Sequence, residues 1–384
     1  MIPYGRQSIS DADIGAVVDV LRSDWLTQGP EIERFEHVVA DYVGARYAVA
    51  VSNGTAALHL ACLAAGLGPG DRLWTSPITF VASANCGRYC GADVDFVDID
   101  PRTYDMSPDA LEAKLVAAER EDRLPAVVIP VHLAGQPCDM ARIAELADRY
   151  GFTVIEDASH AIGATYRNSR TGDGTYSAMT VLSFHPVKIV TTGEGGMVLT
   201  NDDALAGKVA LLRTHGITRD PQLMGHEADG GWYYEQLELG LNYRMTDIQA
   251  ALGANQMTRI DEFLTRRRTI AARYDAELAG LPLSLPWQSP DGASAWHLYV
   301  IRVRPDAPRS RREVYDSLRA AGIGVNVHYI PVHLQPYYRG LGFSPGGYPV
   351  AEAYYSEAIS LPIFPAMTAE EQDAVIAAVR EALR

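Results

Sequence analysis

The chain has little positive charge, few cysteines and no long apolar segment, and each of these absences narrows its possible roles. Its 33 Lys and Arg residues are outnumbered by 48 Asp and Glu residues, which gives a net charge of −15. An acidic protein is poorly suited to a phosphate backbone, so a nucleic-acid partner is not expected. No apolar run approaches the length of a membrane span, and the N-terminal residues lack the apolar core of a signal peptide. We therefore expect a cytoplasmic protein that binds neither nucleic acid nor a membrane.

The cysteines and histidines do not form a pattern that is typical of a metal site. Cys86 and Cys90 are four positions apart, but neither Cys62 nor Cys138 supplies a second such pair. A run near the C-terminus, 328–333, begins and ends with histidine, again without a third ligand nearby. We expect no metal, and we expect the cysteines to be small buried hydrophobic residues in a reducing compartment.

Predicted strands and helices alternate through the first half of the chain. This alternation predicts an α/β fold whose mostly parallel sheet is covered by helices on both faces. Active sites in such sheets gather at the carboxyl ends of the strands. The predicted strands are 47–51, 72–75, 94–99, 126–130, 153–155, 179–184 and 196–200, and the predicted helices are 11–22, 31–43, 54–67, 109–118 and 139–150.

The second half of the chain predicts a different organisation. A stretch rich in Gly and Tyr, 218–240, predicts a loop excursion, and one long helix is expected from Thr246 to Ala279. Beyond it, predicted strands at 297–304 and 324–329 combine with predicted helices at 310–321 and 368–383. We therefore expect residues 1–250 to form a large α/β/α domain, and residues 251–384 to form the linking helix and a smaller α+β domain.

Two short runs suggest a specific chemistry. Asp157 ends the apolar run Val-Ile-Glu-Asp, and Lys188 follows Ser-Phe-His-Pro-Val just before a Gly-rich turn. Taken singly, Asp157 could be a helix cap and Lys188 a surface residue. Together they are what pyridoxal phosphate (PLP) needs, because a lysine amine can bond to its aldehyde and a carboxylate can pair with its ring nitrogen. The pattern predicts a large domain that binds PLP.

Further residues complete a candidate cofactor site. Gly54 and Thr55 open a helix after an apolar strand, where free backbone N–H groups favour a phosphate, and the hydroxyl of Ser183 could join them. Phe80 could stack on a planar ring, and His160 could bond Asp157 or line the cofactor. Each has an ordinary structural alternative: an N-cap for the helix start, a core aromatic for Phe80 and a satisfied buried histidine for His160.

Two segments are candidates for substrate contacts. The run that starts at His328 follows a predicted strand and is better explained as a substrate-lining loop than as a metal site. Arg244, which follows Asn242 by two positions, could bind a carboxylate or a phosphate through two hydrogen bonds. It could equally pair with an acidic neighbour.

These runs together resemble the DegT/DnrJ/EryC1/StrS family of sugar aminotransferases over almost the whole chain. The resemblance implies a fold-type I PLP-dependent aminotransferase and a homodimer with active sites shared between subunits. It implies that Asn242 reaches the cofactor phosphate of the partner subunit. Some relatives are dehydratases with histidine in place of the lysine, so Lys188 favours transamination. The residues that the resemblance places at the substrate are Tyr4, Asp24, Trp25, Leu26, Thr27, His328, Tyr329, Ile330 and Pro331.

Within the family, the resemblance is greatest to enzymes of pseudaminic acid biosynthesis. It implies transfer of an amino group from L-glutamate to C4 of a UDP-linked 4-keto-6-deoxy-2-acetamido sugar, with release of 2-oxoglutarate. Amination of another UDP- or dTDP-linked keto-deoxysugar is one alternative. A PLP-binding sensor without turnover is another, although the chain shows no basic helix-turn-helix segment.

Overall fold

The computed structural model describes residues 1–384 and is built around a seven-stranded sheet. The strand order is β1-β9-β8-β5-β4-β2-β3, and only β9 runs antiparallel to its neighbours. The predicted mostly parallel α/β sheet is therefore confirmed. The strands are β1 (Tyr47–Val51), β2 (Arg72–Thr75), β3 (Asp93–Phe96), β4 (Val127–Ile129), β5 (Thr153–Asp157), β8 (Met179–Ser183) and β9 (Gly196–Thr200).

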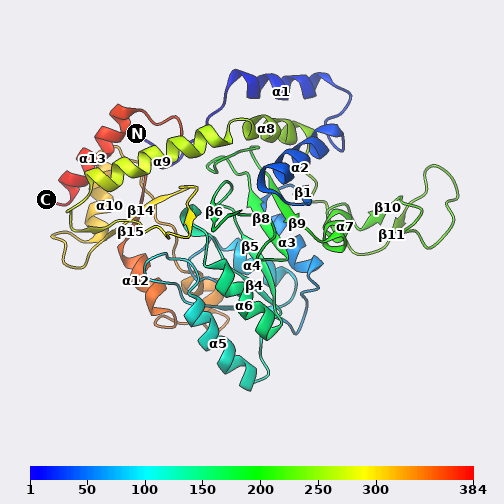
Figure 1. The fold of residues 1–384 in the computed structure, drawn as a ribbon, viewed down its shortest axis with the longest axis horizontal. Coiled ribbons are helices and arrows are strands. Elements are labelled where there is room, and N and C mark those ends of the chain that lie inside the picture. Colours follow the sequence, from blue (N-terminus) through cyan, green and yellow to red (C-terminus); the bar gives the residue numbers. More distant parts are fainter.

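Helices cover both faces of this sheet, as Figure 1 shows. One face packs on α3 (Gly54–Ala64), α4 (Ala82–Tyr89) and α7 (Asp203–Leu212). The other face is covered in two parts: α5 (Pro108–Arg120) and α6 (Met140–Tyr150) pack on its β2, β4 and β5 side, while α2 (Pro30–Val43) and α8 (Asp247–Met257) pack on its β1, β8 and β9 side. The three layers follow from strands whose side chains are buried on both faces.

A second, smaller sheet is antiparallel and has the order β12-β14-β15. Its strands are β12 (Leu283–Ser284), β14 (Tyr299–Val303) and β15 (Ala358–Leu361), and its core includes residues of α9 (Ile260–Glu277), α10 (Arg311–Ala320) and α13 (Ala369–Ala382). The N-terminus joins this part of the fold, because Ile2 forms a β-bridge with Ile323. The division of the chain at residue 250 remains a prediction.

The single long helix expected from Thr246 to Ala279 is wrong, because two helices, α8 and α9, occupy that stretch. The Thr258 hydroxyl donates to the carbonyl of Asn255 at 2.7 Å, and the N–H of Arg259 bonds three residues back to Gln256. A side chain that competes for a helical carbonyl favours a bend. The stretch 324–329 is not a regular strand either; it makes one isolated bridge, between Asn326 and Ser360.

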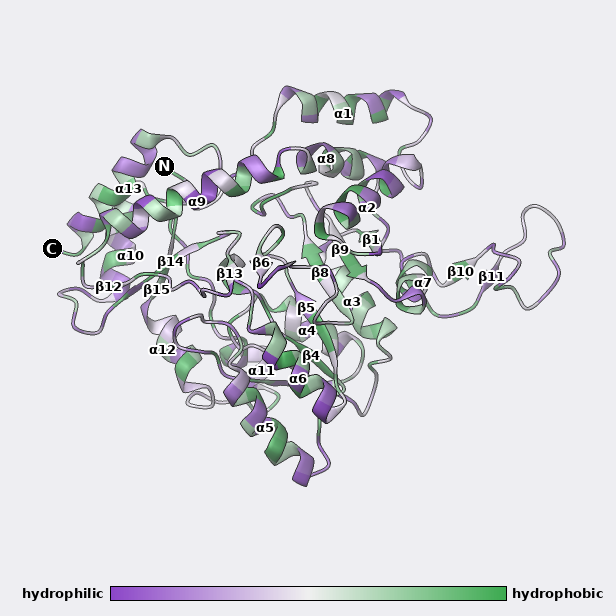
Figure 2. Cartoon of the chain, in the orientation of Figure 1, coloured by the Kyte–Doolittle hydropathy of each residue, from purple (hydrophilic) through white to green (hydrophobic).

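Helix starts follow the local chemistry of the sequence. Helix α8 begins with a capping box in which Thr246 and Gln249 satisfy each other's backbone N–H groups, and α1 (Asp11–Arg22) begins the same way with Ser10 and Asp13. Figure 2 shows polar and apolar residues alternating along α9, as expected for a helix with one face on a core. The remaining helices are α11 (Pro336–Arg339) and α12 (Pro349–Glu357), and the 3-10 turns are Leu133–Gly135 and Val332–Leu334.

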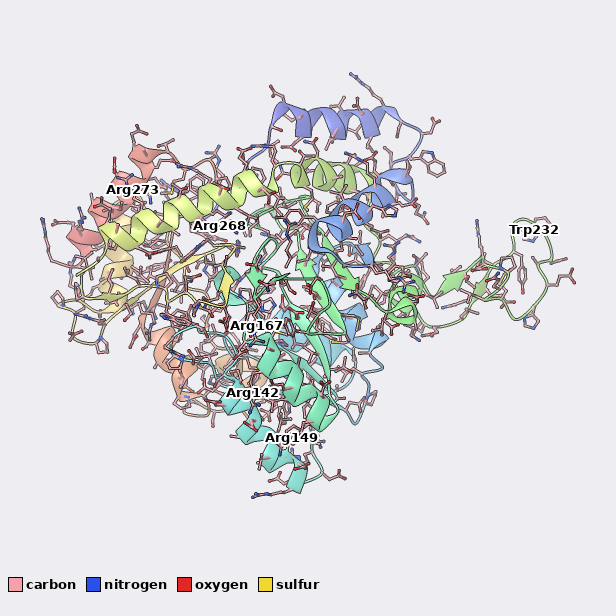
Figure 3. The ribbon with its side chains drawn as sticks, viewed as in Figure 1. Arg142, Arg149, Arg167, Trp232, Arg268 and Arg273 are labelled. Carbon is pink, nitrogen blue, oxygen red and sulfur yellow. The ribbon has the colours of Figure 1, made fainter.

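The Gly- and Tyr-rich excursion projects away from the body of the molecule (Figure 1). Its base is a two-stranded ribbon of β10 (Ile217–Thr218) and β11 (Glu235–Gln236). Trp232 lies toward its far end in Figure 3 and is 74% exposed.

A third small sheet has the order β13-β6-β7, with strands β6 (Thr165–Tyr166), β7 (Ser169–Arg170) and β13 (Gly292–Ala293). No helix is long and apolar enough to span a bilayer.

Candidate active site

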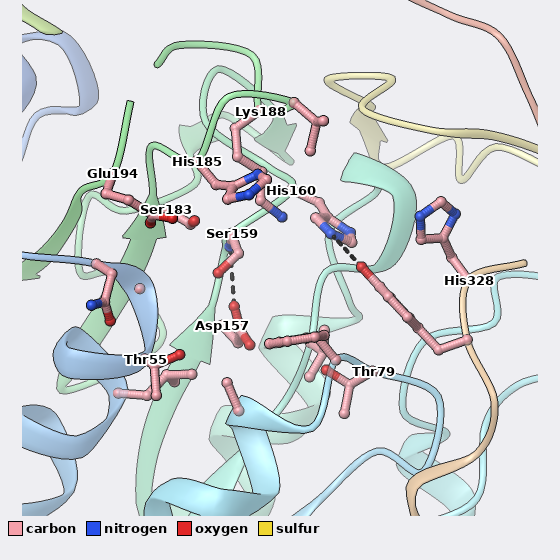
Figure 4. Close-up of a pocket in the computed structure, with 18 of the residues that line it drawn as sticks. Thr55, Thr79, Asp157, Ser159, His160, Ser183, His185, Lys188, Glu194 and His328 are labelled. Atoms are coloured by element: carbon pink, nitrogen blue, oxygen red, sulfur yellow. Dashed lines mark hydrogen bonds between the residues drawn. The ribbon is translucent and has the colours of Figure 1, made fainter. Parts of the chain in front are cut away.

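A cavity of about 780 Å³ lies at the carboxyl ends of the parallel strands. It collects residues that the sequence places far apart: Asp157 at the end of β5, Lys188 in the loop after β8, and Gly54 at the start of α3. Figure 4 shows Lys188 on one side of this space and Asp157 on the other. The carboxyl edge of the sheet is where such a site is expected.

The carboxylate of Asp157 is held by a short network. The Ser83 hydroxyl donates to its Oδ2 at 2.6 Å, and the backbone N–H of Ser159 donates to its Oδ1 at 3.1 Å (Figure 4 marks the second bond). Ser83 is itself 2.7 Å from the hydroxyl of Thr79. Asp157 is 5% exposed and has no cationic side chain bonded to it. A buried carboxylate fixed in this way is oriented to accept a proton or a cationic N–H from a ligand in the cavity.

The amine of Lys188 is prepared for nucleophilic and base chemistry. Burial lowers the pKa of Lys188 to about 8, although the negative charge of Asp157 acts in the opposite direction. Moving an ammonium out of water disfavours its charged form. A lysine with a pKa near 8 holds an appreciable neutral fraction close to neutral pH, as a general base or a covalent nucleophile requires.

The start of α3 provides donors for an anion. Asn53 caps the helix by accepting the N–H of Ala56 at 2.8 Å, whereas the N–H groups of Gly54 and Thr55 meet no acceptor within the chain. The hydroxyls of Thr55 and Ser183 also face the cavity without a partner. A Cβ on Gly54 would lie 3.0 Å from the Cβ of Ser183, so a larger residue would crowd this cradle. The arrangement fits the phosphate of PLP.

His160 and Tyr329 form a pair at the wall of the cavity. The N–H of Ala134 donates to Nδ1 of His160 at 3.3 Å, so the proton of the neutral ring is on Nε2, which lies 3.2 Å from the hydroxyl of Tyr329. Burial, reinforced by the charges of Lys188 and His328, holds the pKa of His160 well below its usual range. His160 is therefore a neutral donor to Tyr329, and the phenol proton of Tyr329 remains available to a ligand.

The N-terminal segment and the segment after α10 meet at the cavity. Tyr4 packs on His328 with ring centroids 5.3 Å apart, and Phe80 lies 6.4 Å from the ring of Tyr329. Phe80 is 59% exposed, so it is not the core aromatic that the alternative reading required. Burial, with a contribution from Lys188, lowers the pKa of His328 to about 3, and its Nδ1 lies 2.7 Å from the Ser360 hydroxyl.

Several predicted residues lie outside this cavity. Trp25 and Leu26 are exposed, at 55% and 48%, in the turn between α1 and α2. Asn242 is exposed and forms a β-bridge with Thr214, and Arg244 makes no ion pair within the chain. The complete set outside the cavity is Asp24, Trp25, Leu26, Thr27, Asn242, Arg244, Ile330 and Pro331.

The cavity also contains residues that the sequence reasoning did not single out. Ser159, His185, Glu194 and Asn326 line it, and Ser83 supports Asp157 from α4. No spacing rule in the sequence pairs Ser83 with a carboxylate 74 positions away. His185 and Glu194 lie in the same loop and turn as Lys188, but only the lysine was predicted there as a site residue.

Both the sequence and the fold are similar to those of known proteins. The family model described as the DegT/DnrJ/EryC1/StrS aminotransferase family matches residues 7–380. The spore coat polysaccharide biosynthesis protein SpsC of Bacillus subtilis is 40% identical over 387 residues, with 100% of this chain and 97% of SpsC covered.

Solved structures extend the similarity to the fold. The putative sugar aminotransferase Spr1654 from Streptococcus pneumoniae, in a PMP form, has a TM-score of 0.90 at 31% identity and covers 100% of this chain and 99% of its own. A PLP form of the same protein is also similar. Helicobacter pylori PseC, an aminotransferase involved in the biosynthesis of pseudoaminic acid, has a TM-score of 0.90 at 28% identity and covers 100% of this chain and 99% of its own.

Proposed function

Because the chain belongs to the DegT/DnrJ/EryC1/StrS aminotransferase family, we propose that it transfers the amino group of L-glutamate to C4 of a UDP-linked 2-acetamido-2,6-dideoxy-4-keto-hexose. The family assignment makes it a sugar aminotransferase of fold-type I with PLP as its cofactor. The finer proposal corresponds to formation of UDP-4-amino-4,6-dideoxy-N-acetyl-β-L-altrosamine in pseudaminic acid biosynthesis, carried out in the cytoplasm. The likeness to PseC supports this choice of sugar.

One observation carries the catalytic part of the proposal: a lysine of lowered pKa, a buried carboxylate and a helix start with two free backbone N–H groups share a single cavity. Gly54, Thr55 and Ser183 would hold the phosphate of PLP, Asp157 its ring nitrogen, and Lys188 its aldehyde carbon. PLP, when bound, supplies the electron sink that makes the α-carbon proton of an amino acid acidic.

The other steps of the reaction are assigned to individual residues of the chain. Nζ of Lys188, in its neutral form, takes the proton from the α-carbon of glutamate and later returns a proton to C4 of the sugar. The carboxylate of Asp157 keeps the proton on the ring nitrogen. Phe80 covers one face of the cavity, and His160 and Tyr329 present a fixed hydroxyl to the ligand.

The proposal includes a wall for the sugar nucleotide made of Tyr4, His328 and Tyr329. A UDP-sugar is large and dianionic, so it needs aromatic faces for the base and polar groups for the sugar hydroxyls. These three residues provide both, from the N-terminal segment and from the segment after α10. The exposed Ile330 and the adjacent Pro331 would extend this wall toward the nucleotide.

We also propose a homodimer with shared active sites. Asn242 and the turn from Asp24 to Thr27 carry polar and aromatic groups, yet they do not line the cavity of their own subunit. In a second copy, Asn242 would reach the cofactor phosphate, and Arg244 would bind a carboxylate or phosphate of the ligand. The exposure of Trp25 and Leu26 is consistent with burial by a partner.

The experiment that tests the substrate is product analysis by NMR. Purified holoenzyme is incubated with L-glutamate and a panel of UDP- and dTDP-linked 4-keto and 3-keto deoxysugars. The proposal expects 2-oxoglutarate together with an amino group on C4 of the UDP-linked acetamido sugar. If the enzyme prefers a dTDP-sugar, or aminates C3, the proposed substrate is wrong but the protein is still a sugar aminotransferase. Absence of 2-oxoglutarate with every sugar would favour a PLP-binding sensor without turnover.

A further inference from the structure

Two neighbouring carboxylates on β5 point in opposite directions, and only one belongs to the cavity. Successive residues of a strand face opposite sides of the sheet, so Glu156 is directed away from the side where Asp157 lies. Glu156 is 5% exposed and does not line the cavity. A buried carboxylate is costly to keep unless it is paired and hydrogen-bonded, so its presence beside Asp157 calls for a role.

The carboxylate of Glu156 is fully engaged. Its Oε2 lies 2.7 Å from Nε2 of His132, while its Oε1 accepts from the hydroxyls of Ser177 at 2.5 Å and Thr180 at 3.3 Å. Burial alone would raise the pKa of Glu156, but these hydrogen bonds outweigh it and the pKa is lowered. The group is therefore an anion held by three donors from two segments, the loop after β4 and the start of β8.

His132 connects this anion to the backbone of Asp157. Its ring is completely buried, and Nδ1 accepts the N–H of Cys138 at 3.1 Å, so the proton that faces Glu156 is on Nε2. The backbone N–H of His132 donates to the carbonyl of Asp157 at 3.1 Å, and the N–H of Asp157 donates to the carbonyl of Pro130 at 2.9 Å. One residue thus binds the side chain of Glu156 and the main chain of Asp157.

We propose that the buried Glu156–His132 pair is a positioning element that fixes the ends of β4 and β5 and so aims the carboxylate of Asp157 at the PLP ring nitrogen. The inference rests on the proposed role of Asp157. Charge-assisted hydrogen bonds are about twice as strong as neutral ones. A pair that includes the charged carboxylate of Glu156 therefore restricts movement of the strand ends more than a neutral pair would. Small displacements of an orienting group have large effects on reactions that depend on alignment.

The test uses holoenzyme loaded with nitrogen-15-labelled PLP and follows the ring-nitrogen signal by NMR as pH is raised. In Glu156→Gln, which keeps the shape but loses the charge, we expect the ring nitrogen to lose its proton at lower pH than in the parent. The glutamate half-reaction should slow by about 10- to 100-fold, the range seen when a group that orients a functional side chain is removed. Parent-like titration and rate in Glu156→Gln would overturn the proposal.

A matched control comes from a second Glu–His pair in the same chain. His333 is also completely buried, and its Nε2 lies 2.9 Å from Glu352, but neither residue lines the cavity. Glu352→Gln should lower thermal stability without moving the ring-nitrogen signal. If it moves the signal as far as Glu156→Gln does, the effect is general destabilisation and the positioning role is refuted.

Two further variants distinguish failure of the Glu156–His132 proposal from failure of the proposed role of Asp157. Asp157→Asn should shift the ring-nitrogen titration more than Glu156→Gln; if it does not shift it at all, the proposed role of Asp157 fails. A shift in Asp157→Asn with none in Glu156→Gln overturns the pair alone. Should Glu156→Gln not fold, Ser177→Ala removes one bond to the same carboxylate. It is expected to show a smaller shift of the same sign, and a parent-like signal there would overturn the proposal.

Discussion

The hydroxyl of Tyr329 lies 3.2 Å from Nε2 of His160, although the two residues are 169 positions apart. Tyr329→Phe would leave the buried Nε2–H of His160 without an acceptor, which costs about 1–3 kcal/mol. We therefore expect a lower thermal midpoint for this variant, measured by circular dichroism on the holoenzyme. Tyr4→Phe is the control, because the hydroxyl of Tyr4 makes no hydrogen bond within the chain. Equal stability of Tyr329→Phe and the parent would contradict the assigned bond.

The lowered pKa of Lys188 predicts how cofactor loading depends on pH. Burial lowers this pKa to about 8, and only the neutral amine attacks an aldehyde. The rate at which the apo-protein takes up PLP should rise with pH and level off above about 8, followed by absorbance. Because the charge of Asp157 raises the pKa of Lys188, Asp157→Asn should move the midpoint to lower pH. A midpoint at the pH of an ordinary lysine would contradict the burial effect.

Lys188 itself is tested by removal. Lys188→Ala should abolish turnover but still hold PLP through the donors of Gly54, Thr55 and Ser183, because those groups are independent of the lysine. Borohydride treatment followed by peptide mass analysis should place the cofactor on Lys188 in the parent protein and on no residue in the variant. Near-normal turnover by Lys188→Ala would refute the mechanism.

Much of this fold was predictable because its signals are local. The alternation of strand and helix patterns along the chain predicted the mostly parallel sheet. The break between α8 and α9 was not predicted. There the hydroxyl of Thr258 bonds the carbonyl of Asn255, a competition with the helical hydrogen bonds that favours a bend. Such competition leaves no trace in hydrophobic periodicity.

The candidate site shows the same division between local and distant signals. Asp157 and Lys188 stand in distinctive runs and could be selected from the sequence. Ser83, which donates to Asp157 at 2.6 Å, and His132, which pairs with Glu156, could not, because each pairing joins separate elements through the tertiary fold. The exposed positions of Asn242 and Trp25 leave their roles as predictions, since those depend on a second subunit.

The proposed homodimer predicts complementation between two inactive variants. If Asn242 serves the partner's cofactor, mixing Lys188→Ala and Asn242→Ala subunits should restore activity in one of the two sites of each heterodimer. About a quarter of parental activity is the ceiling after random exchange, because half of the dimers are mixed and each has one intact site. Exchange is verified with differently tagged subunits. No rescue after verified exchange would place Asn242 in its own subunit's site or outside the site.

The wall formed by Tyr4 and His328 predicts a selective effect on the sugar substrate. Both side chains line the cavity and pack on each other, and a sugar nucleotide needs such a surface whereas glutamate does not. Tyr4→Ala and His328→Ala should each raise the KM for the UDP-sugar by about tenfold or more, the effect of losing about 1.4 kcal/mol of binding. The glutamate half-reaction, followed separately by stopped-flow absorbance, should stay near the parental rate.

The control for this prediction must account for stability, because His328 also bonds Ser360 and its loss will lower the stability of the protein. His333→Ala controls for this loss of stability, because it removes another buried histidine, which bonds Glu352 and lies outside the cavity. Equal damage to both half-reactions in Tyr4→Ala and His328→Ala, matched by His333→Ala, would mean that the two residues only pack the surrounding structure and do not bind the sugar.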